Sequence, residues 1–368
     1  MSSEILHVPV GPMRRFVEDA FVKLGVPEQD ARVTADVLLA ADLRGIESHG
    51  IGRLKVYTDR IRKGQLSPTT NVEVVHEGTA VAVVDGHHGM GPVIACRAME
   101  MAIDKAKNVG LGAVAVRDSS HFGIAGYYPL MAVREGLIGL TVTNARPSVL
   151  PTFGTEPMFG TNPIAFGAPT DEACPFLFDA ATSVVPRGKL EVLSRAERPT
   201  PAGWVGDAHG RSATDTNEIL SGLNDGAFGL YPLGGEGEFF GGHKGYGLAM
   251  VVEILCASLQ GGAYLKELAS QRPDGAVRKQ NLGHFFLAID IAAFGSPEEF
   301  RRTTGDILRR LRAARRADGQ DRIFTAGEKE WENEARIRDQ GIPVNSNLRS
   351  ILEQVKDGLG LDGRDLPF

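Results

Sequence analysis

Cysteine is scarce in this 368-residue sequence, which contains only Cys96, Cys174 and Cys256. Three cysteines so far apart provide neither a disulfide framework nor a zinc-binding pattern, so we expect reduced thiols in a reducing compartment. No cluster of histidine, cysteine and carboxylate residues has the spacing of a metal site, and we expect no bound metal.

Long apolar runs are missing as well. No stretch of 18 uninterrupted apolar residues occurs, which argues against a membrane span. The first residues lack the basic and apolar regions of a signal peptide, and we therefore expect a cytoplasmic protein. A net charge of −6 argues against nucleic-acid binding, which needs a basic face. The arginines between 309 and 316 lie among acidic residues and are interpreted as a solvated helix face rather than an RNA-binding surface.

Standard catalytic and nucleotide-binding fingerprints are also absent. The sequence contains no G-x-G-x-x-G after a predicted strand, no G-x-x-x-x-G-K-[ST], no H-E-x-x-H and no G-x-S-x-G. A dinucleotide bound to this protein would therefore not be held in the Rossmann manner.

The sequence does contain the pattern of a globular α/β enzyme with two or three lobes, with 42% hydrophobic residues and 45 glycines. Helical periodicity covers residues 11 to 64, and the charged segment after 296 also reads as helical. Strands are expected at 72–75, 80–84, 113–116, 137–143, 176–178 and 284–290, with helices at 92–109, 125–135 and 248–259. The glycine- and proline-rich run 144–162 predicts a long loop with a function.

One short segment places a proton-transfer group beside a fixed cation. Ser48 is a good N-cap residue, and a helix that begins there would place His49 and Arg53 on one face, about 5–6 Å apart at their β-carbons. Gly50 and Gly52 would each cost roughly 1 kcal/mol in a helix, which indicates close backbone approach by a ligand or another segment. A surface helix start with a solvated histidine is the alternative.

Other polar groups cluster at the ends of predicted strands and helices. His121 follows a buried strand, at the edge where α/β sheets bind ligands, although it could simply bond its own loop. His243 and Lys244 begin a glycine-rich helix and could bind phosphate or form a structural turn. Asp179 offers a carboxylate for ribose or a helix cap, and Thr161 lies in a turn with small donors. Together these clusters suit a phosphate-bearing cofactor and a small acidic substrate.

Eight motifs in this order resemble those of the malate / L-lactate / L-sulfolactate dehydrogenase family, non-Rossmann NAD(P)-dependent oxidoreductases. The resemblance covers about residues 10–355. Its motifs lie at 47–50 with Arg53, 119–123, 143–148, 151–154, 160–166, 179–183, 187–189 and 243–247.

The resemblance implies a homodimer and a fold of the α/β class. A non-Rossmann mixed-sheet domain would bind the cofactor, and a helical lobe would be built from both chain ends. We place a helical N-terminal segment at 1–70, the α/β cofactor-binding domain at 71–295, and a helical C-terminal segment that packs with the N-terminal lobe at 296–368.

Individual roles also follow from the resemblance. His49 corresponds to the proton-transfer residue with Ser48 as a relay, and His121 to a second histidine that some members use as acid/base. Arg53 corresponds to the substrate-carboxylate anchor, and Thr161 to a substrate contact. The implied cofactor contacts are His121, Phe122, Gly123, Asn144, Asp179, Ala180, Ala181, Arg187, Gly188, His243, Lys244, Gly327, Glu328 and Lys329.

Two positions depart from the family pattern. Ala326 replaces a common proline, and Lys189 replaces the carboxylate that completes the relay in the cyclic-imine reductases of the family. We therefore expect hydride transfer between NAD or NADP and the 2-carbon of a small 2-hydroxy acid, with His49 preferred over His121 as the base. Reduction of a cyclic imine 2-carboxylate and a catalytically silent dinucleotide-binding protein are the alternatives. A dicarboxylate would need a second cation, Arg146 or Lys189, near Arg53.

Overall fold

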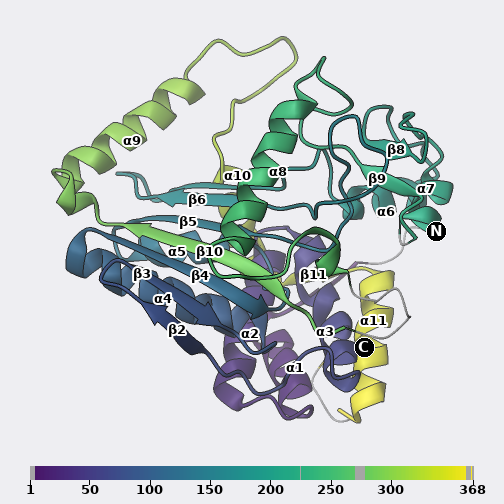
Figure 1. Ribbon diagram of the computed structural model, residues 1–368, viewed down its shortest axis with the longest axis horizontal. Helices are drawn as coiled ribbons and strands as arrows, with labels where there is room; N and C mark the ends of the chain where they lie inside the picture. The colour runs from purple at the N-terminus through teal and green to yellow at the C-terminus, as the bar shows by residue number, and fades with distance from the viewer. Residues whose placement is uncertain (1–4, 224, 270–277, 362–365, 367–368) are drawn as a thin grey trace.

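The computed structural model describes residues 5–223, 225–269, 278–361 and 366, and a seven-stranded mixed sheet lies at its centre (Figure 1). The strand order is β2-β3-β4-β10-β5-β6-β7, with β3 and β4 parallel and every other neighbouring pair antiparallel. The strands are β2 Glu73–Glu77, β3 Val81–Asp85, β4 Leu111–Ser119, β5 Ile138–Thr143, β6 Ile164–Ala168, β7 Phe176–Ala180 and β10 Leu282–Ile289. The predicted α/β class is confirmed, and the six expected strands are all in this sheet; β6 was not predicted.

Helices cover both faces of the sheet. Helices α4 (Gly91–Val109) and α5 (Tyr127–Arg134) pack on one face, and α8 (Gly242–Ala257) packs on the other. Strand β10 contributes side chains to the cores on both faces of the sheet, because successive side chains of a strand point to opposite faces. Phe286 joins the core under α4, whereas Phe285 packs with the α8 residues around Val252. A central strand buried on both sides explains why residues 284–290 read as a continuous apolar run.

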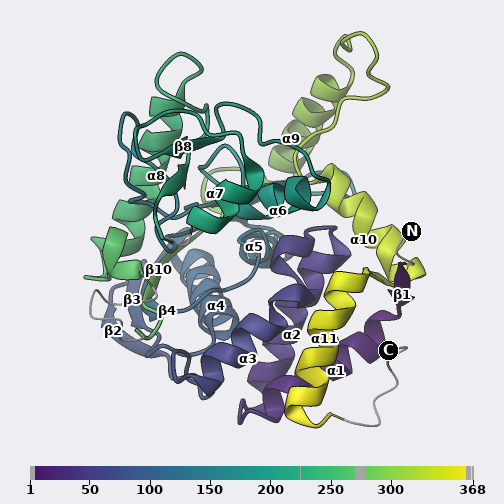
Figure 2. The same cartoon turned by 90° about the vertical axis from the view of Figure 1, so that its right-hand side faces the viewer.

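A helical lobe combines the two ends of the chain (Figure 2). It contains α1 Val10–Val22, α2 Glu28–Leu43, α3 Leu54–Arg62, α10 Glu328–Gln340 and α11 Ser346–Leu359. The short strands β1 (Leu6–Val8) and β11 (Ile342–Val344) pair antiparallel and join the ends directly. One apolar core, which includes Phe16, Leu38 and Leu352, runs through all three of α1, α2 and α11.

The part of the chain between β5 and α8 forms a third, smaller apolar core. Its elements are α6 Arg187–Arg195, β8 Val205–Asp207, α7 Thr216–Gly222 and β9 Phe228–Leu230. The predicted long loop is confirmed, since residues 144–162 form no helix or strand beyond isolated bridges at Val149. The short elements of this region were not predicted because each is too short to show a period.

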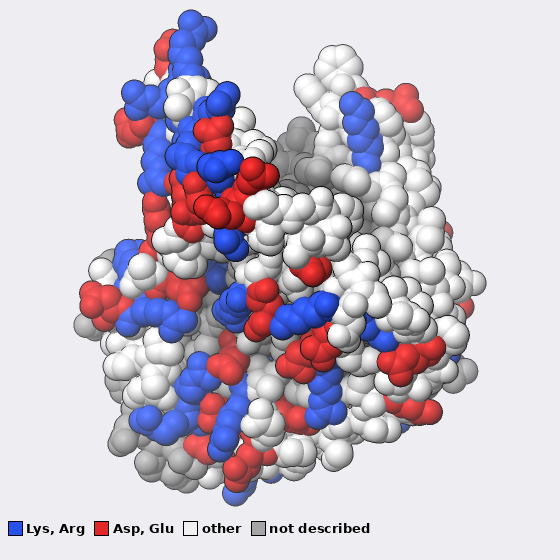
Figure 3. All heavy atoms as spheres, turned by 90° about the vertical axis from the view of Figure 1, so that its left-hand side faces the viewer, with Lys and Arg blue, Asp and Glu red and all other residues white. Residues whose placement is uncertain are grey.

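Helix α9 (Pro297–Arg312) stands apart from the helical lobe, beside the edge of the sheet (Figures 1 and 2). In Figure 3 the projection that contains α9 is covered by charged side chains of both signs. The projection on the other side of the molecule, where α8 lies, carries few charges on the visible face. In the part of the chain that the structure describes, no helix is both long and apolar enough to cross a membrane.

Candidate active site

Two histidines that are distant in the sequence stack on each other between the helical lobe and the sheet. His49 comes from the segment before α3, and His121 from the loop that follows β4. Their ring centroids are 5.5 Å apart and the planes differ by 21°. The stacking brings the two imidazole rings side by side although their residues come from different parts of the chain.

The His49 segment folds as two 3₁₀ turns, Glu47–His49 and Ile51–Arg53, ahead of α3. The prediction of one helix beginning at Ser48 was wrong, because Gly50 has extended backbone and separates the turns. Ser48 lies inside the first turn, where its Oγ is 2.9 Å from His49 Nδ1. The Arg53 Nε donates to the Ser48 carbonyl at 2.5 Å, which ties the cation to the turn that carries the histidine.

Asp42 of α2 holds this double turn in place. Its buried carboxyl accepts a hydrogen bond of 2.6 Å from the backbone N–H of Ile51. A β-carbon at residue 50 would overlap the Asp42 carboxyl, so Gly50 is required by close approach of α2. Burial raises the pKa of Asp42 to about 8, with Glu47 adding to the rise and the Ile51 hydrogen bond opposing it. At neutral pH the group is therefore largely an uncharged acid.

An Asp42→Asn variant should weaken the pH dependence of stability. The folded pKa of about 8 lies above the ordinary value of 3.8, so this group's contribution is complete below pH 3.8 and is lost as the pH rises towards 8. Asparagine keeps an acceptor for Ile51 and has no proton to lose. Denaturant unfolding at pH 5 and pH 8 measures the effect: the wild type should lose more free energy of unfolding than the variant. Equal losses would show that Asp42 is ionised in the folded protein.

The hydroxyl of Tyr57, on α3, contacts both the imidazole ring and the backbone carbonyl of His121. Its hydroxyl lies 2.7 Å from His121 Nδ1 and 2.9 Å from the His121 carbonyl oxygen. A hydroxyl has one proton, so Tyr57 donates either to Nδ1 or to the carbonyl, and in the second case it accepts from Nδ1–H. Tyr57 can therefore accompany a change in the protonation of His121. In either arrangement the ring's Nε2 is left for a ligand.

Both histidines are held in the neutral form. Burial and the positive charge of Arg53 lower the pKa of His49 to about 4. Burial is the largest cause that keeps the pKa of His121 well below its usual value, and interactions with His49, Arg53 and Arg60 act in the same direction. Neutral imidazole is the form that accepts a proton, so each ring is available as a base at neutral pH.

Three cavities surround this centre. The first, of about 480 Å³, is lined by His121, Thr161 and Arg187 together with Arg60 and Arg146. The second, of about 550 Å³, is lined by Ser48, Arg53, Gly188 and Lys189. Since the neighbouring residues Arg187 and Gly188 line different cavities, the first turn of α6 lies where the two meet. The third, of about 300 Å³, is lined by Asp179, Gly327 and Lys329.

Comparison with known proteins identifies the family of the chain. A family model described as malate/L-lactate dehydrogenase matches residues 8–353. The chain belongs to this family. The malate dehydrogenase of Pyrococcus horikoshii is 44% identical over 359 residues, which is 97% of each chain. The L-sulfolactate dehydrogenase of Methanocaldococcus jannaschii is 38% identical over 354 residues, 96% of this chain and 97% of that one. The crystal structure of malate dehydrogenase from Entamoeba histolytica is similar with a TM-score of 0.94 and 41% identity, over 99% of this chain and 100% of that one.

The residues near His121 that were predicted to contact the cofactor are fixed in place by the surrounding structure. Phe122 is buried and stacks on His284, with ring centroids 4.5 Å apart. Gly123 has φ +81°, a conformation that suits glycine. Asn144 is buried and uses its amide on backbone groups, donating to Ala263 and accepting from Gly283.

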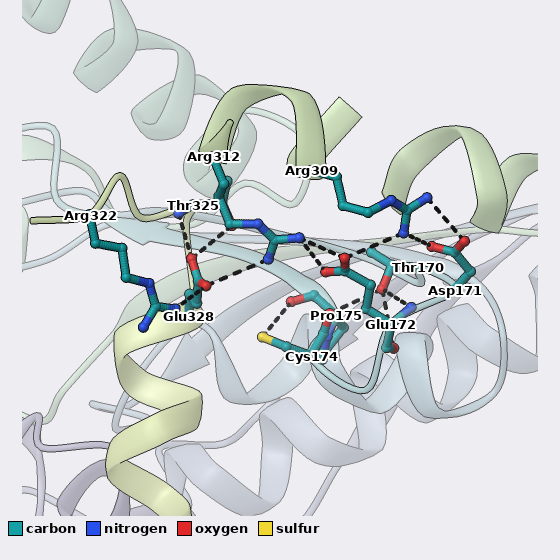
Figure 4. A network of polar contacts seen from close by, with 10 residues as sticks. All are labelled: Thr170, Asp171, Glu172, Cys174, Pro175, Arg309, Arg312, Arg322, Thr325 and Glu328. Carbon is teal, nitrogen blue, oxygen red and sulfur yellow. Dashed lines mark hydrogen bonds and ion pairs between the residues drawn. The ribbon is translucent and has the colours of Figure 1, made fainter. Parts of the chain in front are cut away.

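Glu328 belongs to an ion network rather than to the wall of the third cavity (Figure 4). Its carboxylate contacts Arg322 and Arg312 and accepts from the Thr325 backbone N–H at 2.9 Å. Arg312 also reaches Glu172, 2.6 Å away, so the network joins α9, α10 and the β6–β7 turn. Through Thr325, Glu328 orders the segment that carries Gly327 and Lys329 into the cavity.

The same network accounts for much of the arginine-rich stretch. Arg309 pairs with Asp171 at 2.8 Å and Arg312 with Glu172 (Figure 4). Outside this network, Arg310 pairs with Asp306 at 2.8 Å within α9. Charges that pair within the chain support the interpretation of a solvated helix face.

The remaining predicted contacts lie at element ends. Ala180 ends β7, Ala181 follows it, and both are half-buried. His243 and Lys244 are exposed on the first turn of α8, as predicted for a helix start.

Sequence reasoning missed Tyr57 and Arg60, both of which reach the site from α3. With Arg53 they form a stripe at i, i+4 and i+7, the spacing of one helix face. That spacing could have indicated them. His284 and Asp42, by contrast, lie in predicted core elements and carry no such pattern.

Proposed function

We propose that this protein transfers a hydride reversibly between NAD or NADP and the 2-carbon of a small 2-hydroxy acid. The stacked His49–His121 pair beside the Arg53 guanidinium is the observation that carries the proposal. Two neutral bases and a cation provide what oxidation of a 2-hydroxy acid needs: a proton acceptor for the hydroxyl and an anchor for the carboxylate.

His49 removes the hydroxyl proton. Ser48 Oγ is 2.9 Å from His49 Nδ1, which leaves Nε2 for the substrate. Arg53 holds the carboxylate through its terminal amines, since its Nε is engaged by the Ser48 carbonyl. His121, oriented by Tyr57 and stacked on His49, serves as the second polar contact. Two fixed contacts on the carboxyl and hydroxyl groups determine which face of the 2-carbon is presented for hydride transfer.

The third cavity fits one part of a dinucleotide. Asp179 supplies a carboxylate for ribose hydroxyls, and Lys329 a cation for phosphate. Gly327 has φ +88°, and a β-carbon there would lie only 3.0 Å from Leu177, so the backbone itself forms part of the wall. The nicotinamide, when bound, supplies and accepts the hydride. One relative is named for NADP(+) and another for NAD(+), and we therefore propose that the cofactor is NAD or NADP.

A substrate panel tests this function. The purified protein is assayed with 2-keto acids and with NADH and NADPH in turn, by the loss of nicotinamide absorbance. Turnover of at least one 2-keto acid is expected. Turnover of pyrroline- or piperideine-2-carboxylate alone would favour the cyclic-imine reductase, and cofactor binding without any turnover would favour the silent protein. The imine activity is less favoured because Lys189 stands in place of the relay carboxylate.

The homodimer expected from the family resemblance is proposed to form through the outer face of α8. Leu248, Val251 and Ile254 are 41%, 50% and 57% exposed and follow one another at i, i+3 and i+6. An apolar stripe of this kind on an outer helix is typical of a subunit contact. Light scattering should give twice the chain mass for the wild type and a lower mass for Ile254→Glu. Ile307→Glu, at a 53% exposed residue of α9, is the matched control.

A further inference from the structure

Helix α9 is seated on the turn between β6 and β7, although it stands apart from the helical lobe. The backbone N–H of Asp171 in this turn donates to the Arg301 carbonyl at 3.2 Å, and Arg309 pairs with the Asp171 carboxylate. A β-carbon at residue 305 would overlap the same carboxylate, so Gly305 is required by the close approach of α9. The helix is therefore fixed to the turn that leads into β7.

Arg312, at the C-terminal end of α9, contacts carboxylates from two different segments (Figure 4). Its Nη2 lies 2.6 and 2.7 Å from the two carboxylate oxygens of Glu172, in the turn before β7. Its Nη1 lies 3.5 Å from Oε1 of Glu328, the first residue of α10. The guanidinium has donors for both carboxylates because its N–H groups form a rigid fork. The Glu328 side chain is only 9% exposed, so water replaces a lost contact poorly.

The two segments joined in this way form two walls of the third cavity. Strand β7 supplies one wall, and the segment around Gly327 supplies another. Glu172 precedes the first wall and Glu328 lies in the second segment, but neither side chain lines the cavity. The walls also meet directly, through a hydrogen bond of 3.4 Å from the Leu177 N–H to the Ala326 carbonyl, which is long for such a bond. The bridge from α9 therefore adds a charged link outside the cavity to a weak link beside it.

We propose that Arg312 is a positioning residue, which joins Glu172 to Glu328 and so holds two walls of the third cavity at the separation that binds the dinucleotide. This inference rests on the proposed function, in which the cavity takes one part of the cofactor, and it gives α9 a role in cofactor affinity. Arg312 lines neither this cavity nor the one that contains His121. Its loss should therefore weaken cofactor binding and leave the hydride-transfer step unchanged.

The test compares Arg312→Gln with the matched control Arg310→Gln. Arg310 is two residues away on α9 and pairs with Asp306 of the same helix at 2.8 Å. Affinity for NADH and NADPH is measured by calorimetric titration. For the cofactor that the wild type binds, Arg312→Gln should raise the Kd by about 3- to 20-fold, the size expected of a residue that acts through a network. The kcat at saturating cofactor should stay within about twofold. Arg310→Gln should change neither quantity.

Three further variants separate the bridge from the seat of α9. Arg309→Gln weakens the seat on the β6–β7 turn but leaves the bridge in place, and it should cost less affinity than Arg312→Gln. Arg312→Lys keeps the charge without the fork and should fall between the wild type and Arg312→Gln. In a Glu328→Gln background, Arg312→Gln should cause little further loss, because the link is already broken.

Hydrogen exchange of the unliganded protein tests the bridge without any cofactor. Mass spectrometry should show faster exchange over residues 322–329 in Arg312→Gln than in Arg310→Gln, because the Thr325 N–H donates to the Glu328 carboxylate that Arg312 holds. Equal exchange in the two variants would show that Arg312 does not order this wall.

Other results would also overturn the inference. These are an unchanged Kd in Arg312→Gln, an equal loss in Arg309→Gln or Arg310→Gln, or fully additive losses with Glu328→Gln. If the wild type binds neither NADH nor NADPH, the proposed function fails instead, and the exchange rates then decide separately whether Arg312 joins the two walls.

Discussion

Replacing His49 with asparagine should lower kcat for 2-hydroxy acid oxidation by roughly 10²- to 10⁴-fold, the usual contribution of a general base. Asparagine can keep the contact with Ser48 but cannot accept a proton at the Nε2 position. Affinity for NADH, measured by fluorescence titration, should change little. Turnover at the wild-type rate in this variant would remove His49 from the mechanism.

The second histidine provides the comparison. His121→Asn should affect KM more than kcat if His121 orients the substrate, since Tyr57 and His121 lie beside the base rather than in its place. A collapse of kcat in His121→Asn with near-normal kcat in His49→Asn would transfer the role of base to His121. The contacts of Ser48 and Tyr57 are both made at Nδ1, so the Nε2 atom of each ring is the one that can meet the substrate.

Replacing Arg53 with glutamine should lower kcat/KM by about 10²- to 10³-fold, because removing one partner of a desolvated charge pair typically costs 2–5 kcal/mol. Arg53→Lys should recover only part of this loss, since lysine keeps the charge but not the planar fork that matches a carboxylate. Steady-state kinetics with one 2-keto acid for all three proteins makes the measurement.

Loss of folding must be separated from loss of the anchor. Arg53 Nε also donates to the Ser48 carbonyl, so the variant could disturb the turn that carries His49. An unchanged thermal midpoint and unchanged NADH affinity would assign the loss to substrate binding. If Arg53→Lys falls as far as Arg53→Gln in the thermal midpoint as well, the arginine acts on the turn and not on the substrate.

Much of the sheet could be predicted from local patterns. The run 284–290 and the helix after Pro92 carry strong periodicity, and the structure has β10 and α4 there. The helix start at Ser48 failed for a tertiary reason: the Asp42 carboxyl, from another helix, bonds Ile51 and occupies the space beside Gly50. A capping preference is a contribution of about 1 kcal/mol and is readily overridden by such packing.

By itself the sequence determined the class of the protein and the absence of the Rossmann fingerprint, and it supplied most residues of the candidate site, because periodicity and motif order are properties of the chain. Only the tertiary structure decided which of those residues meet. It stacked His49 on His121, placed Arg146 in the cavity of His121 and Lys189 in the cavity of Ser48, and added Tyr57 and Arg60. The physical reason is that these groups come from different elements, and their distances follow from how the helical lobe packs against the sheet.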